Sequence, residues 1–369
     1  MYDLVIIGAG VVGLSIAQYF QVERHWQCLV VEKEEQFGQG ISSRNSEVIH
    51  AGFYYATGSL KAGLCIEGKN RLYSYLKRNN LPFRRCGKYV LAPPDRTSEL
   101  ERLQTQGRIN GVDDLEWVGG RQVQGLYREL APHPALHSPS TGILSVDALM
   151  HHLAGEFRAA GGDLAVKTAF TAMTPQGEEY VLTLTSTSGE AVSLPAQRVI
   201  NAAGLGALEV AGRAGFDYKE RGYRLGHCKG SYFRVPGARR KFHHLIYPLP
   251  TPTSLGIHLR LDLQDEVRLG PDVEYLPDGI VDYTVDPALE REFRERVREY
   301  WPKIDGYDLE PDWAGIRPHL FVGSKRYHDF HIVDERDAGC PGWVNMLGID
   351  SPGLTSALAF GPYINGLWT

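Results

Sequence analysis

The first 32 residues of the chain, MYDLVIIGAGVVGLSIAQYFQVERHWQCLVVE, decide the fold. The largely apolar run at residues 3–7 predicts a strand, the glycine-rich run at 8–13 follows without a gap, and residues 14–20 predict a helix. A second apolar run then predicts another strand, which ends on Glu32. Strand, glycine turn, helix, strand and acidic residue in this order are typical of a βαβ unit that binds a dinucleotide.

The three glycines of this turn have separate expected roles. Gly8 allows a tight turn, Gly10 lets the backbone approach a pyrophosphate, and Gly13 lets helix and strand pack closely. The helix N-terminus then offers N–H groups and a partial positive charge to the phosphates. The alternative is an ordinary βαβ unit whose glycines serve packing alone, and the acidic residue at the strand end argues against it.

Glu32 follows Gly13 by nineteen residues, where a carboxylate can accept hydrogen bonds from a ribose diol. A carboxylate in this place repels a 2′-phosphate, so NADP is disfavoured. Val12 and Lys33 are the neighbouring candidates for cofactor contacts.

Length and composition predict a two-domain globular protein without nucleic-acid partners. The chain has 369 residues, 43% of them hydrophobic and 22% charged, and a net charge of −5. Its five cysteines are scattered and never form a CxxC pair, which indicates reduced thiols rather than a disulfide frame or zinc site. No apolar run is long enough to span a membrane, and a cleavable presequence would have to consume the cofactor site. We therefore expect a cytoplasmic protein.

A polar, glycine-rich loop at 37–46 follows the second strand and is expected to fold back over the cofactor. Arg44 is the candidate cation for the phosphates, and Ser43, Asn45 and Ser46 are the candidate hydrogen-bonding residues. A solvated loop is the alternative, but it does not explain the small apolar residues that follow it.

The pattern along the chain predicts an α/β protein in which βαβ pieces at the start, middle and end alternate with β-rich insertions. The predicted Rossmann-like, FAD- or NAD-binding domain is built from three discontinuous segments, 1–82, 141–222 and 322–369. The insertions, 83–140 and 223–321, build a β-rich α+β substrate domain over it.

Several longer stretches resemble one known family in register along the chain. They are NSEVIHAGFYY at 45–55, GSLKA at 58–62, CGK at 86–88, KGSYF at 229–233, LIYP at 245–248 and GIHL at 256–259. The chain resembles the FAD-dependent oxidoreductases of the D-amino-acid oxidase and glycine oxidase superfamily, and within it the L-2-hydroxyglutarate dehydrogenase (oxidase) group. It departs from that group at Glu47, where glycine is usual, and at Arg260, where threonine is common. The segment 350–355 only approximates the usual cofactor-closing segment.

The resemblance implies that the cofactor is FAD and adds further flavin contacts. They are Gly52, Phe170, Ala203, Gly204, Gly348, Ser351, Gly353, Leu354 and Thr355. A helix that starts at Gly353 would direct its N-terminus at the flavin ring, where two-electron reduction places negative charge.

Oxidation of a 2-hydroxy acid or an amino acid needs a group that holds the carboxylate and a group that takes a proton. Arg317 is the candidate for the carboxylate, because a guanidinium binds it bidentately and GIRP at 315–318 resembles the carboxylate-binding stretch of glycine oxidase. His50 and His258 are the two candidate bases. For His50 the resemblance also allows covalent attachment of FAD, and we weigh non-covalent contact above it.

Two further side chains complete the predicted site. Tyr247 could donate a hydrogen bond to the substrate, and Lys61 could meet a second carboxylate or the flavin, at even odds with a solvated helix lysine. A metal site among the clustered histidines is rejected because their spacing fits no ligand set.

The predicted reaction is the FAD-dependent oxidation of a small L-2-hydroxy acid, most of all L-2-hydroxyglutarate, to the 2-oxo acid by hydride transfer to flavin N5. An amino-acid or glycine-type oxidase is the alternative on the same fold, and a non-catalytic flavin- or NAD-binding module is a remote one. The electron acceptor (oxygen, a quinone or a carrier protein), a weak peripheral contact with a membrane and the oligomeric state are left open.

Overall fold

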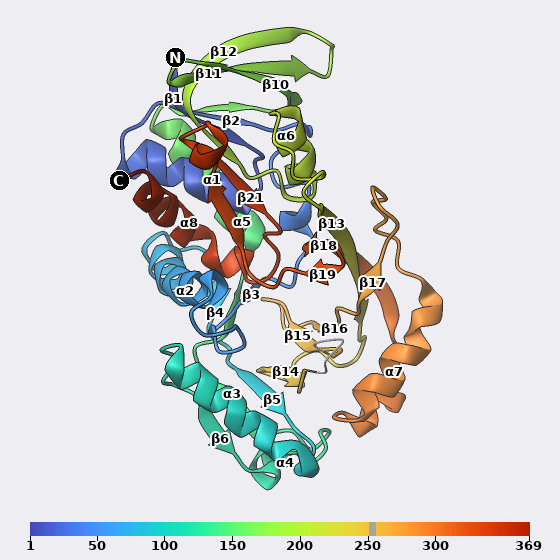
Figure 1. Cartoon of the computed structure of the whole chain (residues 1–369). Helices are drawn as coiled ribbons and strands as arrows, with labels where there is room; N and C mark the ends of the chain where they lie inside the picture. Colours follow the sequence, from blue (N-terminus) through green and yellow to red (C-terminus); the bar gives the residue numbers. More distant parts are fainter. Residues whose placement is uncertain (251–255) are drawn as a thin grey trace.

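Two large sheets carry most of the strands of the computed structural model, which describes residues 1–250 and 256–369. In Figure 1 one sheet lies at the top of the molecule and the other below it, and the chain crosses between them repeatedly. The first sheet has eight strands, of which six follow the order β10-β11-β12-β1-β2-β9, while β21 pairs with β12 and β20 with β21. The predicted α/β class is confirmed.

The strands of the first sheet come from three distant parts of the sequence. They are β1 (Tyr2–Ile7), β2 (Cys28–Val31), β9 (Asp163–Ala165), β10 (Thr168–Gln176), β11 (Glu179–Ser186), β12 (Ala191–Asn201), β20 (His331–Asp334) and β21 (Trp343–Leu347). The strand β1 pairs in parallel with β2 and β12, and β12 pairs in parallel with β21. Parallel strands end at the same edge of a sheet, so the turns after β1, β2, β12 and β21 lie together.

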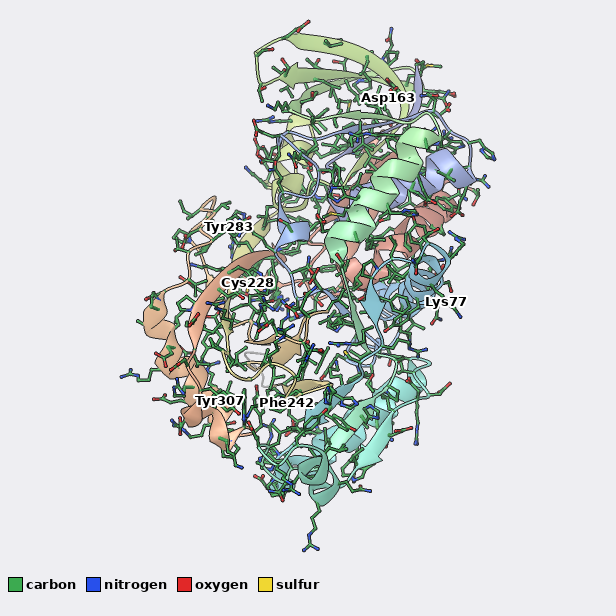
Figure 2. All side chains as sticks on the ribbon, turned by 180° about the vertical axis from the view of Figure 1, so that it is seen from behind. Lys77, Asp163, Cys228, Phe242, Tyr283 and Tyr307 are labelled. Carbon is green, nitrogen blue, oxygen red and sulfur yellow. The ribbon has the colours of Figure 1, made fainter. Side chains whose placement is uncertain are left out.

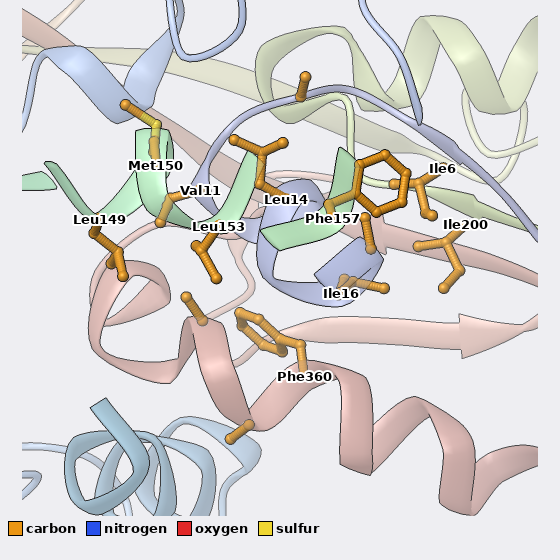
Figure 3. Close-up of a cluster of buried hydrophobic side chains, with 14 of the residues drawn as sticks. Ile6, Val11, Leu14, Ile16, Leu149, Met150, Leu153, Phe157, Ile200 and Phe360 are labelled. Carbon is orange, nitrogen blue, oxygen red and sulfur yellow. The ribbon is translucent and has the colours of Figure 1, made fainter. Parts of the chain in front are cut away.

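Helices pack against this sheet and bury its apolar face. They are α1 (Val11–Gln18), α2 (Leu60–Arg78), α5 (Val146–Ala159), α6 (Ala207–Arg213) and α8 (Gly353–Trp368). Figure 3 shows Leu14, Leu153, Phe157 and Phe360 from three of these helices around one core, in which all four are fully buried. The helix predicted at 14–20 begins three residues earlier, because Gly10 serves as its N-cap.

The second sheet has ten strands. Nine of them follow the order β19-β18-β13-β16-β15-β14-β5-β7-β6, and β17 pairs with β13. The bounds are β5 (Lys88–Leu91), β6 (Glu116–Val118), β7 (Ala135–Ser138), β13 (Tyr223–Arg234), β14 (Leu245–Pro248), β15 (Leu259–Leu261), β16 (Val267–Leu269), β17 (Glu274–Tyr275), β18 (Glu310–Val322) and β19 (Lys325–Arg326). Helices α3 (Thr97–Ile109), α4 (Gly120–Leu126) and α7 (Glu290–Arg298) flank this sheet. Its core holds fully buried aromatic residues such as Phe233, Phe293 and Trp301.

A small third sheet, β3-β8-β4, lies where the chain passes between the two large ones. Its strands are β3 (Val48–Ile49), β4 (Phe83–Arg84) and β8 (Gly142–Leu144). The division into two domains stays a proposal, and β19, which pairs with β18, places residues 325–326 on the second sheet rather than with the segment 322–369.

All five cysteines lie among the described residues and are buried free thiols. Within 1–250 and 256–369, no helix is long and apolar enough to cross a membrane. In the same ranges, no group of three or more His, Cys, Asp or Glu side chains is arranged to hold a metal ion.

Candidate active site

One cavity of about 800 Å³ runs from the glycine turn after β1 to strands β13, β14 and β18 of the second sheet. Among the predicted cofactor residues, those that line it are Gly8, Gly10, Val12, Glu32, Lys33, Arg44, Asn45, Ser46, Phe170, Ala203, Gly204, Ser351, Gly353, Leu354 and Thr355. The turns at the carboxyl ends of the parallel strands and the loop after β2 therefore meet at one place.

The geometry of the turn after β1 requires glycine at two positions. Gly8 has a φ of +106°, and a Cβ on it would lie 2.6 Å from the carbonyl oxygen of Ala202. A Cβ on Gly13 would lie 1.9 Å from the carbonyl oxygen of Gly8. The glycine at position 13 thus serves the close packing of helix on turn and does not line the cavity.

Glu32 both supports the turn and faces the cavity. Its carboxylate accepts hydrogen bonds from the backbone N–H of Ala9 at 2.8 Å and of Glu34 at 3.0 Å. These bonds fix the carboxylate at the end of β2, which is the position expected to receive a ribose diol.

Ser42, which the sequence did not single out, takes the place expected of Ser43. The hydroxyl of Ser42 accepts a hydrogen bond from Val11 N at 2.9 Å, at the start of α1 and inside the cavity. Ser43 instead donates to the carbonyl of Gly40, is exposed and does not line the cavity. Nothing in a Ser-Ser pair tells which hydroxyl faces the helix, so only the three-dimensional path of the loop separates them.

Two other predicted cofactor residues lie outside the cavity lining and act through the backbone. Gly52 has a φ of +108° and Gly348 a φ of +66°. A Cβ would lie 2.7 Å from the side chain of Ile66 in the first case and 2.7 Å from that of Leu320 in the second. Both glycines permit close packing of the loops that form the walls of the site.

Arg44 lies where the two large sheets face each other across the cavity. Its guanidinium lies over the ring of Tyr283, 4.1 Å from the centroid, and both residues line the cavity. Figure 2 shows Tyr283 at the height where the two parts of the molecule meet. A Cβ on Gly315 would lie 2.0 Å from the carbonyl oxygen of Arg44, so the glycine in β18 lets this loop approach.

The residues present fit a flavin dinucleotide. The glycine turn, the Glu32 carboxylate and the start of α1 lie at one end of the cavity, and the start of α8 at Gly353 lies on its wall. Thr355 in the first turn of α8 accepts a hydrogen bond from His50 N at 3.0 Å and donates to Val48 O at 3.3 Å. These bonds tie the N-terminus of α8 to β3, so that its partial positive charge is directed at a fixed part of the cavity.

The other end of the cavity collects the predicted reacting side chains. Its lining includes His50, Tyr232, Tyr247, His258 and Arg317. They come from the loop after β3, from β13, β14 and β18, and from the stretch before β15. Four of the five catalytic candidates thus line the same cavity as the predicted cofactor residues, and Tyr232 is an addition that the sequence did not predict.

Arg317 is held firmly but keeps donors for a ligand. Its Nη2 donates to the carbonyls of Asp272 at 2.7 Å and Lys229 at 3.1 Å, and its Nε donates to that of Cys228 at 3.4 Å. No hydrogen bond joins Nη1 to a residue of the described ranges. A Cβ on Gly230 would lie 2.9 Å from Nη2, so this glycine in β13 makes room for the guanidinium.

His50 is neutral in this environment. Burial, the positive charge of Lys88 and the neighbouring His258 together lower its pKa to about 3, and burial is the largest cause. Its Nε2 lies 3.3 Å from the hydroxyl of Ser351, and its Nδ1 has no hydrogen-bond partner among the described residues. A neutral imidazole is the form that accepts a proton.

Tyr247 and His258 stack face to face, with ring centroids 3.5 Å apart and an angle of 7° between the planes. Burial raises the pKa of Tyr247 well above its ordinary value, so its hydroxyl stays protonated and can donate. Beside them the hydroxyls of Ser46 and Tyr232 are hydrogen-bonded at 2.5 Å.

Lys61 does not line the cavity, which corrects its predicted contact with substrate or flavin. Its ammonium forms a buried ion pair with Asp350 at 2.5 Å, and Arg326 contacts the other oxygen of this carboxylate at 3.1 Å. Asp350 itself lines the cavity. Lys61 therefore acts on the site through the carboxylate that it holds.

The two positions at which the chain departs from its resemblance, Glu47 and Arg260, are neighbours in space. The guanidinium of Arg260 is buried, and its Nη2 lies 3.9 Å from a carboxylate oxygen of Glu47. Glu47 has a φ of +55°, in the region that favours glycine, and its other oxygen accepts a hydrogen bond from Val146 N at 3.1 Å. Glu47 lines the cavity, and the guanidinium of Arg260 lies behind it, outside the lining.

The fold and the glycine turn define the class of protein, a dinucleotide-binding oxidoreductase whose cavity extends to a second sheet. The model of the FAD dependent oxidoreductase family matches residues 3–365, and the chain belongs to this family. It is therefore an FAD-dependent oxidoreductase, and FAD is its cofactor.

Among known proteins, L-2-hydroxyglutarate dehydrogenase, mitochondrial, of Arabidopsis thaliana is 34% identical over 98% of this chain and 82% of its own length. L-2-hydroxyglutarate dehydrogenase of Salmonella houtenae is 28% identical over 99% of this chain and 92% of its own. Among solved structures, L-alpha-glycerophosphate oxidase of Mycoplasma pneumoniae with FAD bound has a TM-score of 0.85 at 22% identity. That match covers 100% of this chain and 94% of the other, and it supports the fold.

Proposed function

We propose that the protein oxidises L-2-hydroxyglutarate, or a closely similar small L-2-hydroxy acid, to the 2-oxo acid. The observation that supports the proposal is that Arg317, His50 and His258 line one cavity together with the predicted cofactor residues. The names of the relatives from Arabidopsis thaliana and Salmonella houtenae support the choice of substrate.

The chain supplies what the oxidation requires of a protein. Nη1 of Arg317 binds the substrate carboxylate, while the three carbonyls that hold Nε and Nη2 fix the direction of the guanidinium. A neutral histidine accepts the proton of the hydroxyl group. The phenol of Tyr247 donates to the substrate oxygen. Bound FAD supplies the acceptor for the hydride that leaves Cα.

The identity of the base is part of the proposal. We assign it to His50, because this side chain lines the cavity and its Nδ1 has no hydrogen-bond partner among the described residues. His258 is the second candidate, stacked on Tyr247. In His50→Asn we expect flavin reduction to slow by about 100-fold or more, the usual scale for loss of a general base. A larger loss in His258→Asn with little loss in His50→Asn would reverse the assignment.

A substrate panel tests the proposal against the amino-acid oxidase alternative. The holoenzyme is mixed anaerobically with L-2-hydroxyglutarate, D-2-hydroxyglutarate, glycine or sarcosine, and the absorbance of oxidised flavin is followed. We expect rapid loss of absorbance with the L-hydroxy acid alone. Reduction by glycine or sarcosine, without reduction by either hydroxy acid, would contradict the proposal and favour the alternative.

The electron acceptor (oxygen, a quinone or a carrier protein), a weak peripheral membrane contact and a cytoplasmic location stay predictions. They do not enter the experiments above, because the reduction of the flavin by substrate is measured without an acceptor.

A further inference from the structure

Lys88, the first residue of β5, is a buried cation without a counter-ion. Its side chain is fully buried, and its Nζ has no hydrogen-bond partner among the described residues. No carboxylate in the described ranges forms an ion pair with it. Burying an ammonium group is costly unless another group compensates the charge, so its environment requires an explanation.

Three aromatic rings form a cage around this ammonium. Nζ lies 4.7 Å from the ring centroid of Phe53, 4.5 Å from that of Tyr54 and 4.7 Å from that of Tyr247. The faces of aromatic rings attract a cation, and each contact contributes more when water is excluded. The rings carry no net charge, so the cage holds the positive charge in place without cancelling it.

The cage adjoins the reacting end of the cavity. Tyr247 lines the cavity and also contributes a wall of the cage. His50 lines the cavity too, and the positive charge of Lys88 contributes to lowering its pKa. The ammonium therefore lies behind one layer of side chains, close enough for its field to reach a bound ligand.

Two other buried cations of the chain have carboxylates beside them. Lys61 is paired with Asp350, and Arg260 lies 3.9 Å from Glu47. Lys88 differs from both, because three ring faces surround its ammonium and no carboxylate of the described residues pairs with it. A ligand that brings an additional negative charge into the cavity would supply the missing anion.

We propose that Lys88 determines specificity for a dianionic substrate, because its caged ammonium favours a second carboxylate on the cavity side of Tyr247 and His50. The inference rests on the proposed oxidation of a 2-hydroxy acid, with Arg317 on the first carboxylate. Lys88 thereby takes the role of meeting the second carboxylate that the sequence suggested for Lys61, whose ammonium is paired with Asp350.

The ionisable groups that face the ammonium stay neutral near pH 7. They are Cys65 on α2, His50 after β3, Tyr54, and Tyr247 on β14. Burial raises the pKa of Cys65 to about 12 and raises the pKa of both tyrosines above their ordinary value, and the pKa of His50 is lowered to about 3. Burial also lowers the pKa of Lys88, to about 7. The charge behind this wall therefore changes with Lys88 alone.

Two inert ligands of the same shape test the proposal. Glutarate is a dianion and glutaramate, its half-amide, is a monoanion, and neither carries a hydroxyl group that can be oxidised. Their dissociation constants are measured at pH 6 with the FAD-loaded enzyme, from the change in flavin absorbance. A unit charge acting over roughly 7 Å at an effective dielectric constant near 20 predicts that the enzyme prefers glutarate by about 10-fold or more.

The variants separate charge from packing. We expect Lys88→Met to lose most of the preference for glutarate while it still binds glutaramate, and Lys88→Arg to keep the preference. Lys69→Met is the matched control, because Lys69 is also buried but donates to the carbonyl of Ala51 at 3.4 Å. Its preference should equal that of the wild type. An unchanged preference in Lys88→Met would overturn the inference, and so would a wild-type enzyme that binds both ligands equally.

The outcomes also separate this inference from the proposed function. If the wild type is reduced by L-2-hydroxyglutarate but shows no preference for glutarate, only the role of Lys88 fails. If it is not reduced, the proposed substrate fails as well. Should Lys88→Met not fold, the loss of the wild-type preference between pH 6 and pH 9 tests the same charge, and a constant preference would overturn the inference.

Discussion

Replacing Arg317 by methionine should strongly slow the reduction of bound flavin by substrate. Nε and Nη2 of the guanidinium donate hydrogen bonds to three backbone carbonyls, which leaves the two N–H groups of Nη1 for the substrate carboxylate. A hydrogen bond to a charged group contributes about 1.5–3 kcal/mol, so the loss of two such bonds predicts a decrease of about 100-fold or more in the reduction rate constant divided by the substrate dissociation constant. Methionine is long enough to fill the space but brings neither charge nor donor.

The assay is anaerobic stopped-flow spectroscopy over a range of L-2-hydroxyglutarate concentrations, which gives the dissociation constant and the limiting reduction rate separately. Arg317→Lys should lose less, about 10-fold, because it keeps the charge but cannot bind the carbonyls and the carboxylate together. Arg234→Met on the neighbouring strand β13 is the control, since Arg234 is exposed and paired with Glu310. If Arg317→Met stays within about 3-fold of the wild type with a normal flavin content, Arg317 does not hold the substrate carboxylate.

Three further outcomes follow from the geometry. Gly13→Ala should abolish FAD binding, because its Cβ would lie 1.9 Å from a backbone oxygen. Gly63→Ala is the control, since it has open space around it and should keep a full flavin-to-protein absorbance ratio. A Gly13→Ala protein that carries its full amount of flavin would contradict this prediction. The preference for glutarate over glutaramate should be complete below the pKa of Lys88, which is about 7, and it should disappear as the pH rises and the ammonium loses its proton. Because bound glutarate stabilises the charged form of Lys88, the pH at which half of the preference is lost should lie above 7. Glu47→Gly should lower the free energy of unfolding by about 1–2 kcal/mol, since the charge of Arg260 loses its partner while the strain of a positive φ is relieved. Chemical denaturation should show the double variant with Arg260→Thr recovering at least half of this loss, and strictly additive effects would refute the coupling.

The parts of the fold that the sequence predicts well depend on neighbours along the chain. The strand, glycine turn and helix at the start are local, and so is the carboxylate of Glu32 at the end of the next strand. The last helix begins at Gly353, as the resemblance of this segment to the family implied. These features require only the periodicity and the conformational preferences of consecutive residues.

The parts that the sequence did not predict depend on residues far apart in the chain. Lys61 looked free to contact a ligand, and its partner Asp350 is 289 residues away. The cage of Lys88 brings together β5, β14 and the loop that contains Phe53. No pattern of apolar residues along the sequence predicts that these three segments meet. The choice between Ser42 and the next serine depends on the path of a loop, which short-range preferences do not fix.

A single-turnover experiment tests the central claim most directly. The enzyme with its flavin oxidised is mixed anaerobically with excess L-2-hydroxyglutarate, quenched, and assayed for 2-oxoglutarate while a parallel sample gives the amount of flavin reduced. We expect one 2-oxoglutarate for each flavin reduced, and neither product nor flavin reduction with the D-enantiomer. Absence of reduction, in a protein whose flavin is still reduced by dithionite, would contradict it.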